Sequence, residues 1–254
     1  MSKQAAQVLE LLEFFAERKR AATLADVTEH FGWPRSSAFN LLTMLAGRGY
    51  LYEPRPKGGY YPSPRWFSLA EQIRMAEPTP LELHETLHEL VRMSGETVSL
   101  VAASGGIAVF VDVIESPHDV RYAAKIGKTV SLYSSATGRA LLSLRSEAER
   151  ERLLRKAVFV QYTDNTLMSA DAVEREIRRS IRRGWFIGHC EISVGLCGVA
   201  LPVPMADRHY AILVAGPADR MSNRYDELGT QARAIIADYL QIEVPGGPLA
   251  TVPA

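Results

Sequence analysis

Apolar residues recur at helical spacing three times within the first fifty positions, and each run forms one amphipathic stripe. Thr23 followed by Asp26 is typical of a helix N-terminus, and Gly32 is typical of a helix C-terminus. Pro34 suits the first turn of a further helix. The pattern predicts three short helices, with stripes made of Val8, Leu11, Leu12 and Phe15, then Leu24, Val27 and Phe31, then Ala38, Leu41, Leu42 and Leu45.

Two short aromatic runs follow the third stripe, at residues 50–52 and 60–61. The segment between them, residues 54–59, is rich in proline and glycine, so we expect the two runs to pair as a hairpin. Three helices followed by a hairpin is the order of a winged helix-turn-helix. We assign that fold to residues 1–63.

The rest of the chain divides into a linker, a second domain and a tail. Trp66, Leu69 and Ile73 share one side of a linking helix predicted over residues 64–79, and prolines 78 and 80 mark its end. Residues 244–254, rich in proline and glycine, are expected to be disordered. The second domain, residues 80–243, has strand-like runs at 97–103, 107–114, about 120–132, 199–204 and 210–215, and helical runs before Gly95, at 136–144, 147–156 and 171–183, and around 228–239. Strands interleaved with helices indicate an α/β or α+β second domain.

Composition narrows the class of protein. At 254 residues, with 47% hydrophobic and 23% charged residues, the chain is of globular type, and it has no apolar run long enough for a membrane span. No signal peptide is recognised, and two cysteines are too few for a disulfide framework, so we expect a cytoplasmic location. Acidic and basic residues balance at 29 each, but residues 1–67 carry nine Lys and Arg against six Asp and Glu. That basic excess permits nucleic-acid binding without proving it.

The polar face of the third helix is the candidate DNA reader. It carries short polar groups and no acidic residue, so it can enter a major groove without repelling phosphates. Asn40 can bond adenine through two hydrogen bonds, and Arg35 can reach a guanine edge or a phosphate. The alternative is a solvated face whose Ser and Asn side chains serve as caps. The basic hairpin tip favours DNA binding, and the candidate residues are Arg35, Ser36, Ser37, Phe39, Asn40, Thr43, Arg55 and Lys57.

These residues, with several motifs in the second domain, resemble the IclR family of bacterial transcription regulators. The resembling segments, in order and spacing, are GWPRSSA at 32–38, RGYL at 48–51, ETVSL at 96–100, VIES at 113–116, SSATGRALL at 134–142, RGW at 183–185, ALPV at 200–203 and AGPADR at 215–220. The resemblance implies an α+β protein in which a linker helix joins the winged helix to a GAF-like effector-binding domain. It also implies dimers or tetramers on a two-fold symmetric operator, no cofactor, and DNA affinity or polymerase recruitment altered by a small metabolite.

The sequence departs from the family at positions that set specificity. Asn40 stands where the family usually has Arg, so we expect a distinct operator. In relatives that sense glyoxylate or pyruvate, the ligand meets an acidic residue, a cysteine and two serines, and by position these fall on Gly188, Gly198, Leu213 and Ala215. None of the four is polar, and two glycines suggest extra space. We therefore expect a larger, more apolar effector with one polar end, with a small carboxylate as the alternative.

Other candidates for the effector site each have a structural alternative. Ser134, Ser135 and Thr137 begin a helix, where they either help bind an anion or cap the helix. Glu191 either pairs with an arginine, or holds a loop closed, or is a solvated loop carboxylate. Residues that either line the cavity or pack in the core are Tyr133, His189, Leu196 and Cys197.

Enzyme and metal functions receive little support from the sequence. The chain lacks the nucleophile elbow of hydrolases, the zinc-protease motif and the phosphate-binding loop, so we expect no catalysis. His189, Cys190 and Cys197 suggest zinc, but a fourth ligand is missing, so we expect packing and no metal. A protein-interaction module remains the other alternative, and steep salt dependence would distinguish DNA binding from it.

Overall fold

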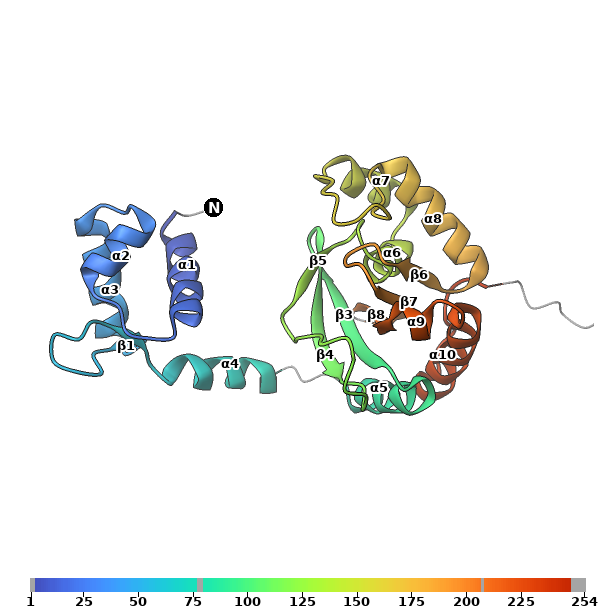
Figure 1. The fold of residues 1–254 in the computed structure, drawn as a ribbon, viewed down its shortest axis with the longest axis horizontal. Helices are drawn as coiled ribbons and strands as arrows, with labels where there is room; N and C mark the ends of the chain where they lie inside the picture. Colours follow the sequence, from blue (N-terminus) through green and yellow to red (C-terminus); the bar gives the residue numbers. More distant parts are fainter. Residues whose placement is uncertain (1–2, 77–79, 207, 248–254) are drawn as a thin grey trace, which may run out of the picture. The chain divides into compact units, whose positions relative to one another are not determined.

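A computed structural model describes residues 3–76, 80–206 and 208–247 (Figure 1). The chain divides into two compact units, Met1–Pro78 and Thr79–Ala254. In the part of the chain that the structure describes, no helix is long and apolar enough to cross a membrane.

The first unit contains the three predicted helices and the predicted hairpin. The helices are α1 (Lys3–Arg18), α2 (Leu24–Phe31) and α3 (Arg35–Gly47), and the strands are β1 (Leu51–Tyr52) and β2 (Tyr61–Pro62), which pair antiparallel. The predicted stripes supply the core, in which Leu11, Phe15, Val27, Leu42 and Leu45 are buried. The third helix begins one residue later than expected, because Pro34 is its N-cap.

Helix α2 begins and ends at the residues that the sequence indicated. The Thr23 hydroxyl accepts a hydrogen bond from the Asp26 amide at 3.2 Å, and the Asp26 carboxylate accepts one from the Thr23 amide at 2.8 Å. Gly32 ends the helix with a φ of +65°, a left-handed conformation that glycine adopts without strain. Trp33 then stacks on Phe31 at 4.2 Å between ring centroids, which fixes the turn into α3.

The hairpin is tied to the helices at its base. Ala22 and Tyr60 exchange backbone hydrogen bonds of 2.9 and 2.8 Å. The hairpin leads into α4 (Arg65–Ala76), whose Trp66 indole donates to the Tyr50 carbonyl at 2.9 Å. The hairpin base and the start of α4 are therefore fixed to the helical core of this unit.

The second unit is built on a six-stranded sheet with the order β5-β4-β3-β8-β7-β6, in which every neighbouring pair is antiparallel. Side chains alternate between its two faces along β7 and β8. The strands are β3 (Thr97–Ser104), β4 (Ile107–Ile114), β5 (Thr129–Ser131), β6 (Phe186–His189), β7 (Leu196–Pro204) and β8 (His209–Pro217).

Helices cover both faces of this sheet (Figure 1). One face packs against α6 (Ala136–Ser143), α7 (Glu147–Arg155) and α8 (Ala170–Arg183). The other packs against α5 (Leu81–Ser94) and α10 (Tyr225–Leu240), and the short α9 (Ala218–Met221) follows β8. The predicted α+β class is confirmed.

Three expectations for this unit were wrong or incomplete. The strand expected at 120–132 is limited to β5, because the preceding segment turns at Gly127, where φ is +84°. Strand β6 and helix α9 were not predicted. The tail expected to be disordered from residue 244 is ordered through residue 247: Val244 is buried, and its carbonyl and that of Pro245 accept hydrogen bonds from Arg233. Residues 248–254 lie outside the described residues.

Candidate functional sites

Helix α3 exposes a mainly polar face on the surface of the first unit, which also carries Phe39 and Met44, 52% and 41% exposed. Its buried side consists of Ala38, Leu42 and Leu45, which pack in the core. The exposed side chains are Arg35, Ser36, Ser37, Phe39, Asn40 and Thr43, the set that the sequence analysis singled out. Because α3 carries no acidic residue, this surface has no carboxylate on its own helix to repel a nucleic-acid phosphate.

The start of α3 is not capped by a side chain. Pro34 is the N-cap, and neither the Ser36 nor the Ser37 hydroxyl bonds to another described residue. The alternative that these serines serve as caps is therefore wrong. The first amides of α3 keep their hydrogen-bonding capacity, and a helix N-terminus with free amides is a favourable site for a phosphate.

The hairpin tip adds positive charge to the same unit. Arg55 and Lys57 are both exposed, and the turn between them is closed by a 2.9 Å hydrogen bond from the Gly58 amide to the Arg55 carbonyl. Together with Arg35, these side chains make no ion pair with any described residue. Their charges remain available to an anionic partner.

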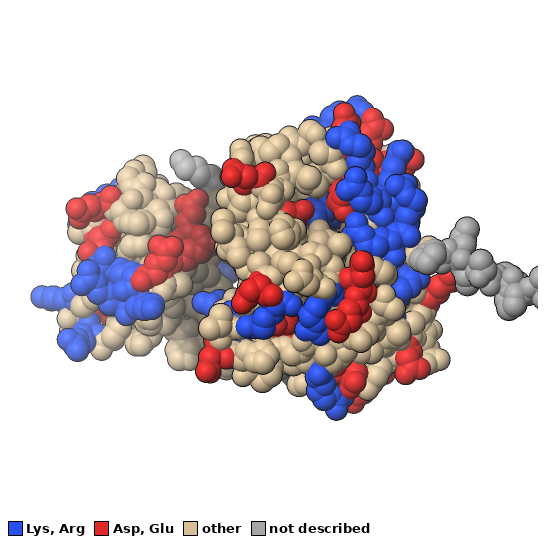
Figure 2. All heavy atoms as spheres, turned by 45° about the vertical axis from the view of Figure 1, so that its right-hand side comes forward, with Lys and Arg blue, Asp and Glu red and all other residues tan. Residues whose placement is uncertain are grey.

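Several arginines of the second unit, unlike Arg35, Arg55 and Lys57, are paired with carboxylates. Figure 2 shows acidic and basic side chains side by side on that unit. On α7 and α8, Arg150 pairs with Glu174 at 2.7 Å, and Arg178 pairs with Glu174 and Glu147. Arg183 pairs with Glu176 at 3.5 Å. Several charges on this face are paired, but Arg152, Arg175 and Arg182 of α7 and α8 are exposed and make no ion pair with a described residue.

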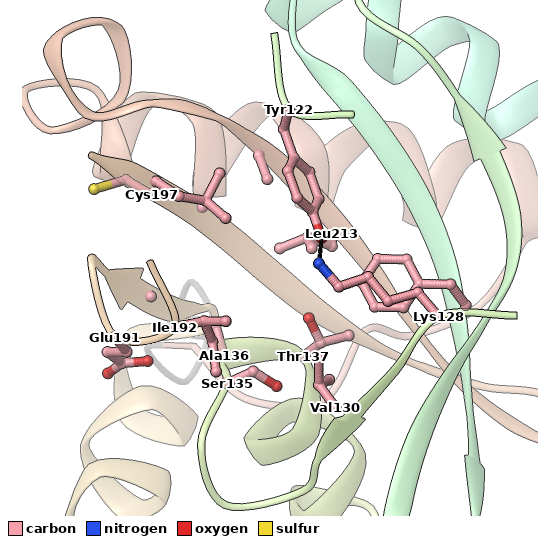
Figure 3. Close-up of a pocket in the computed structure, with 15 residues that line it drawn as sticks. Tyr122, Lys128, Val130, Ser135, Ala136, Thr137, Glu191, Ile192, Cys197 and Leu213 are labelled. Atoms are coloured by element: carbon pink, nitrogen blue, oxygen red, sulfur yellow. Dashed lines mark hydrogen bonds between the residues drawn. The ribbon is translucent and has the colours of Figure 1, made fainter. Parts of the chain in front are cut away.

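The second unit contains a cavity between the sheet and the start of α6. Its volume is about 60 Å³, smaller than a typical small-molecule site, and it is partly open to solvent. Its walls are mainly apolar (Figure 3). The lining residues are Phe110, Tyr122, Lys128, Val130, Ser135, Ala136, Thr137, Gly188, Glu191, Ile192, Leu196, Cys197, Gly198, Leu213 and Ala215.

A few polar groups face this cavity. The Lys128 amine donates a 3.1 Å hydrogen bond to the Tyr122 hydroxyl, and Figure 3 shows the two side chains meeting inside it. The Thr137 hydroxyl makes no hydrogen bond to any described residue. Ser135 caps α6, because its hydroxyl accepts from the Gly138 amide at 3.0 Å. Lys128 and Thr137 are therefore the groups best placed to meet a ligand.

The two glycines in the wall do not leave the space that the sequence analysis expected. A Cβ atom on Gly198 would lie 2.9 Å from the Val214 carbonyl oxygen and 3.0 Å from a Leu213 methyl group. A Cβ atom on Gly188 would lie 3.3 Å from the Ala136 Cβ. Leu213 and Ala136 already fill these positions. The apolar character of the cavity comes from its other walls.

Glu191 pairs with a buried arginine beneath the cavity. The Arg139 guanidinium is fully buried and donates to both Glu191 oxygens at 2.9 and 2.8 Å, and also to the Ile187 carbonyl at 2.8 Å. Burial raises the pKa of the Glu191 carboxyl, and the charge of Arg139 opposes that shift. The Thr166 hydroxyl donates to the Glu191 carbonyl at 2.7 Å. Of the alternatives for Glu191, the arginine pair is therefore the one observed.

The structure brings most of the predicted effector residues to the cavity and excludes three. Tyr133 is buried with its hydroxyl bonded to the Val160 amide, Ser134 bonds to the Ser131 carbonyl, and His189 faces Tyr225. The residues that do line it are Ser135, Thr137, Gly188, Glu191, Leu196, Cys197, Leu213 and Ala215. The sequence analysis missed six lining residues, which come from β4, the loop before β5, β5, the start of α6 and the β6–β7 turn: Phe110, Tyr122, Lys128, Val130, Ala136 and Ile192.

A second group of side chains gathers at the β6–β7 hairpin. The sulfurs of Cys190 and Cys197 lie 3.5 Å apart, and the His189 Nδ1 lies 3.6 Å from the Cys197 sulfur. The Tyr225 hydroxyl of α10 lies 2.8 Å from the same nitrogen. Burial raises the pKa of the Cys197 thiol. Although Cys197 borders the cavity, Figure 3 shows its sulfur directed away from Tyr122 and Lys128.

Known proteins match this chain over both units. Residues 81–239 match the family described as bacterial transcriptional regulator IclR C-terminal, and residues 5–55 match the IclR helix-turn-helix domain. The transcriptional repressor IclR of Escherichia coli K12 is 27% identical over 228 residues, covering 87% of this chain and 82% of the repressor.

Solved structures share the fold. The IclR protein of Thermotoga maritima matches with a TM-score of 0.74 at 20% identity, covering 94% of this chain and 98% of that one. An IclR homologue of Microbacterium hydrocarbonoxydans, complexed with 4-hydroxybenzoate, matches with a TM-score of 0.71 at 19% identity, covering 94% and 99%. The prediction of a regulator that is not an enzyme is confirmed by the family match. The chain belongs to the IclR family of bacterial transcriptional regulators.

Proposed function

We propose that this protein is a cytoplasmic regulator that binds a two-fold symmetric operator through α3 and the hairpin tip, as a homo-oligomer. The observation that carries the proposal is the exposed face of α3, with Arg35 unpaired at its first turn. Two copies related by two-fold symmetry would place two such helices on successive turns of DNA. Phe67 and Ile73 of α4 are 76% and 65% exposed, an apolar surface that a second copy would cover.

Binding to duplex DNA tests this proposal. We expect the binding constant to fall steeply between low and physiological salt, because phosphate contacts release counterions. Arg35→Ala should weaken binding to a preferred sequence by about 10- to 100-fold, the loss typical of one base contact. The matched control is Arg152→Ala, which removes an exposed arginine of α7. Equal effects of the two variants would contradict the role of Arg35, and salt-independent binding would favour a protein-interaction module.

For the effector, we infer an apolar or aromatic compound that carries one carboxylate. The Lys128 amine and the Thr137 hydroxyl offer donors in a mainly apolar cavity, a combination that suits an anionic group at one end of a hydrophobic body. The relative complexed with 4-hydroxybenzoate holds a ligand of this class. The alternative remains a small carboxylate such as glyoxylate or pyruvate.

A thermal-shift comparison separates these effectors. Benzoates should stabilise the protein more than glyoxylate or pyruvate, and a ligand at about 100 times its Kd adds about 2.7 kcal/mol. Benzyl alcohol, which lacks the carboxylate, should stabilise it less than benzoate does. In Lys128→Met, benzoate and benzyl alcohol should stabilise the protein to the same extent. A larger shift with glyoxylate or pyruvate would favour the small-carboxylate alternative.

A further inference from the structure

The β6–β7 hairpin brings together three side chains of the kinds that bind soft metal ions. One atom from each of His189, Cys190 and Cys197 lies within 4.8 Å of the other two. The three residues come from the end of β6, the turn and the start of β7, where His189 pairs with Cys197 across the hairpin. They lie near one another because of strand register, which sequence spacing alone did not reveal.

The distances within the cluster match the edges of a tetrahedral zinc site. Zinc–sulfur bonds of about 2.3 Å and zinc–nitrogen bonds of about 2.0 Å place two sulfurs about 3.8 Å apart and a sulfur and a nitrogen about 3.5 Å apart. The observed separations are 3.5 Å between the sulfurs and 3.6 Å between the Cys197 sulfur and the His189 Nδ1. The third separation, between the Cys190 sulfur and the His189 ring, is within 4.8 Å, so an ion could be held after a shift of these side chains.

The hairpin backbone holds the cluster in place. The Cys190 amide donates to the Leu196 carbonyl at 3.0 Å, and the Thr163 hydroxyl donates to the Cys190 carbonyl at 2.7 Å. Cys190 itself has a φ of +52°, a left-handed conformation that few non-glycine residues adopt. The segment that carries its thiol is thus fixed from two sides.

We propose that Cys190, Cys197 and His189 bind a Zn²⁺ ion, with the Tyr225 hydroxyl or a water molecule at the fourth position. The Tyr225 hydroxyl, 2.8 Å from the His189 Nδ1, is the donor that the sequence analysis did not find. Two thiolates and an imidazole suit Zn²⁺ better than Mg²⁺ or Ca²⁺. On binding, the two thiols would release their protons to solvent.

A disulfide between the two cysteines is the competing use of the same residues. It requires a sulfur–sulfur bond of about 2.05 Å, well below the observed 3.5 Å, and it does not involve His189. The three-way arrangement therefore favours the metal. The hairpin also carries Glu191, Ile192 and Leu196 of the cavity wall, so a bound ion would stabilise the position of that wall.

Titration of the reduced full-length protein with Co²⁺ tests the proposal without knowledge of the effector or operator. We expect stoichiometric binding with thiolate-to-cobalt charge-transfer absorption and the visible bands of four-coordinate Co²⁺, both displaced by Zn²⁺. Cys190→Ser and Cys197→Ser should each weaken binding on the order of 100-fold and reduce the thiolate absorption. The control is the double variant His84→Gln and His88→Gln, which removes another histidine pair, 3.2 Å apart, and should bind as the wild type does.

A second measurement uses the wild type alone, in case the cysteine variants do not fold. Zn²⁺ should slow alkylation of Cys190 and Cys197 together, as read by mass spectrometry of the reduced protein. No thiolate absorption, unchanged absorption in either cysteine variant, loss of absorption in the histidine double variant, or unprotected thiols would each overturn the proposal. A disulfide found in protein that takes up no metal when reduced would overturn it as well.

Discussion

Arg139 shows what a single residue does in this fold and why its role is hidden in the sequence. It lies in α6, and its carboxylate partner, Glu191, lies 52 residues later in the turn after β6. Pairing satisfies one end of the guanidinium, yet the Arg139 Nε has no hydrogen-bond partner among the described residues. The sequence analysis expected an arginine for Glu191 as one alternative, but no local pattern identifies a partner at that separation.

Removing the Arg139 guanidinium should lower the free energy of unfolding. Arg139→Met leaves the Glu191 carboxylate buried without its counter-charge, and losing one partner of a buried pair costs about 3–5 kcal/mol. Urea unfolding measures the difference. The control is Arg155→Met, whose exposed pair with Glu151 should contribute less than about 1 kcal/mol. Equal losses in the two variants would contradict the structural role of Arg139.

At the scale of elements, helix α2 has a pH-dependent N-terminus. Hydrogen bonds from Thr23 lower the pKa of Asp26 below 3.8. A carboxyl whose pKa is lower in the folded state stabilises it above the unfolded value, and that contribution disappears as pH falls from about 4 through the lowered folded value. Asp26→Asn should therefore cost about 0.5 kcal/mol at pH 6, and the difference should shrink as pH falls through the lowered folded pKa.

Two measurements check the role of Asp26. Thermal unfolding of the wild type and Asp26→Asn is compared across this pH range, and the ¹³C shift of the Asp26 carboxyl is titrated by NMR. A titration midpoint at or above the ordinary Asp value, or a stability difference that grows as pH falls, would contradict the assigned hydrogen bonds.

Helix α6 depends on a glycine for its packing. A Cβ on Gly138 would lie 2.2 Å from the Leu132 carbonyl oxygen, so Gly138→Ala must displace the helix start or the preceding loop. We expect a loss of about 1–3 kcal/mol, the usual cost of overpacking, measured by urea unfolding. Gly106→Ala, where an added Cβ meets nothing within 4 Å, is the control and should leave stability nearly unchanged. Tolerance of both substitutions would show that α6 can move.

Elements with a clear period or cap were predicted from sequence, and elements set by distant contacts were not. The apolar stripes of α2 and α3 and the capping box of α2 were sufficient, because local interactions determine them. Strand β6 is only four residues long and gains its register from β7. The loop before β5 has strand-like residues, but it follows β4 through hydrogen bonds such as that from the Gly127 amide to the Phe110 carbonyl at 2.8 Å.

At the scale of the whole molecule, the family and fold class were predicted from motifs spread over both units, and the cavity only in part. Lys128, its cationic group, lies in a segment that was expected to be strand, and no local signal directs its amine inward. The exposed face of α3, which we propose reads DNA, was predictable because it is the complement of one apolar stripe on one helix. A site whose residues come from several strands can be predicted only when the order of those strands in the sheet is known.

Selection of bound sequences from a random pool of duplex DNA, using the full-length protein, tests most directly that this molecule reads DNA through α3. The account predicts an inverted repeat whose half-sites lie about one helical turn, or a multiple of it, apart. It also predicts that Asn40→Ala relaxes the preference at one position in each half-site. Enrichment of no consensus, or a consensus unchanged by substitutions at Arg35 and Asn40, would contradict it.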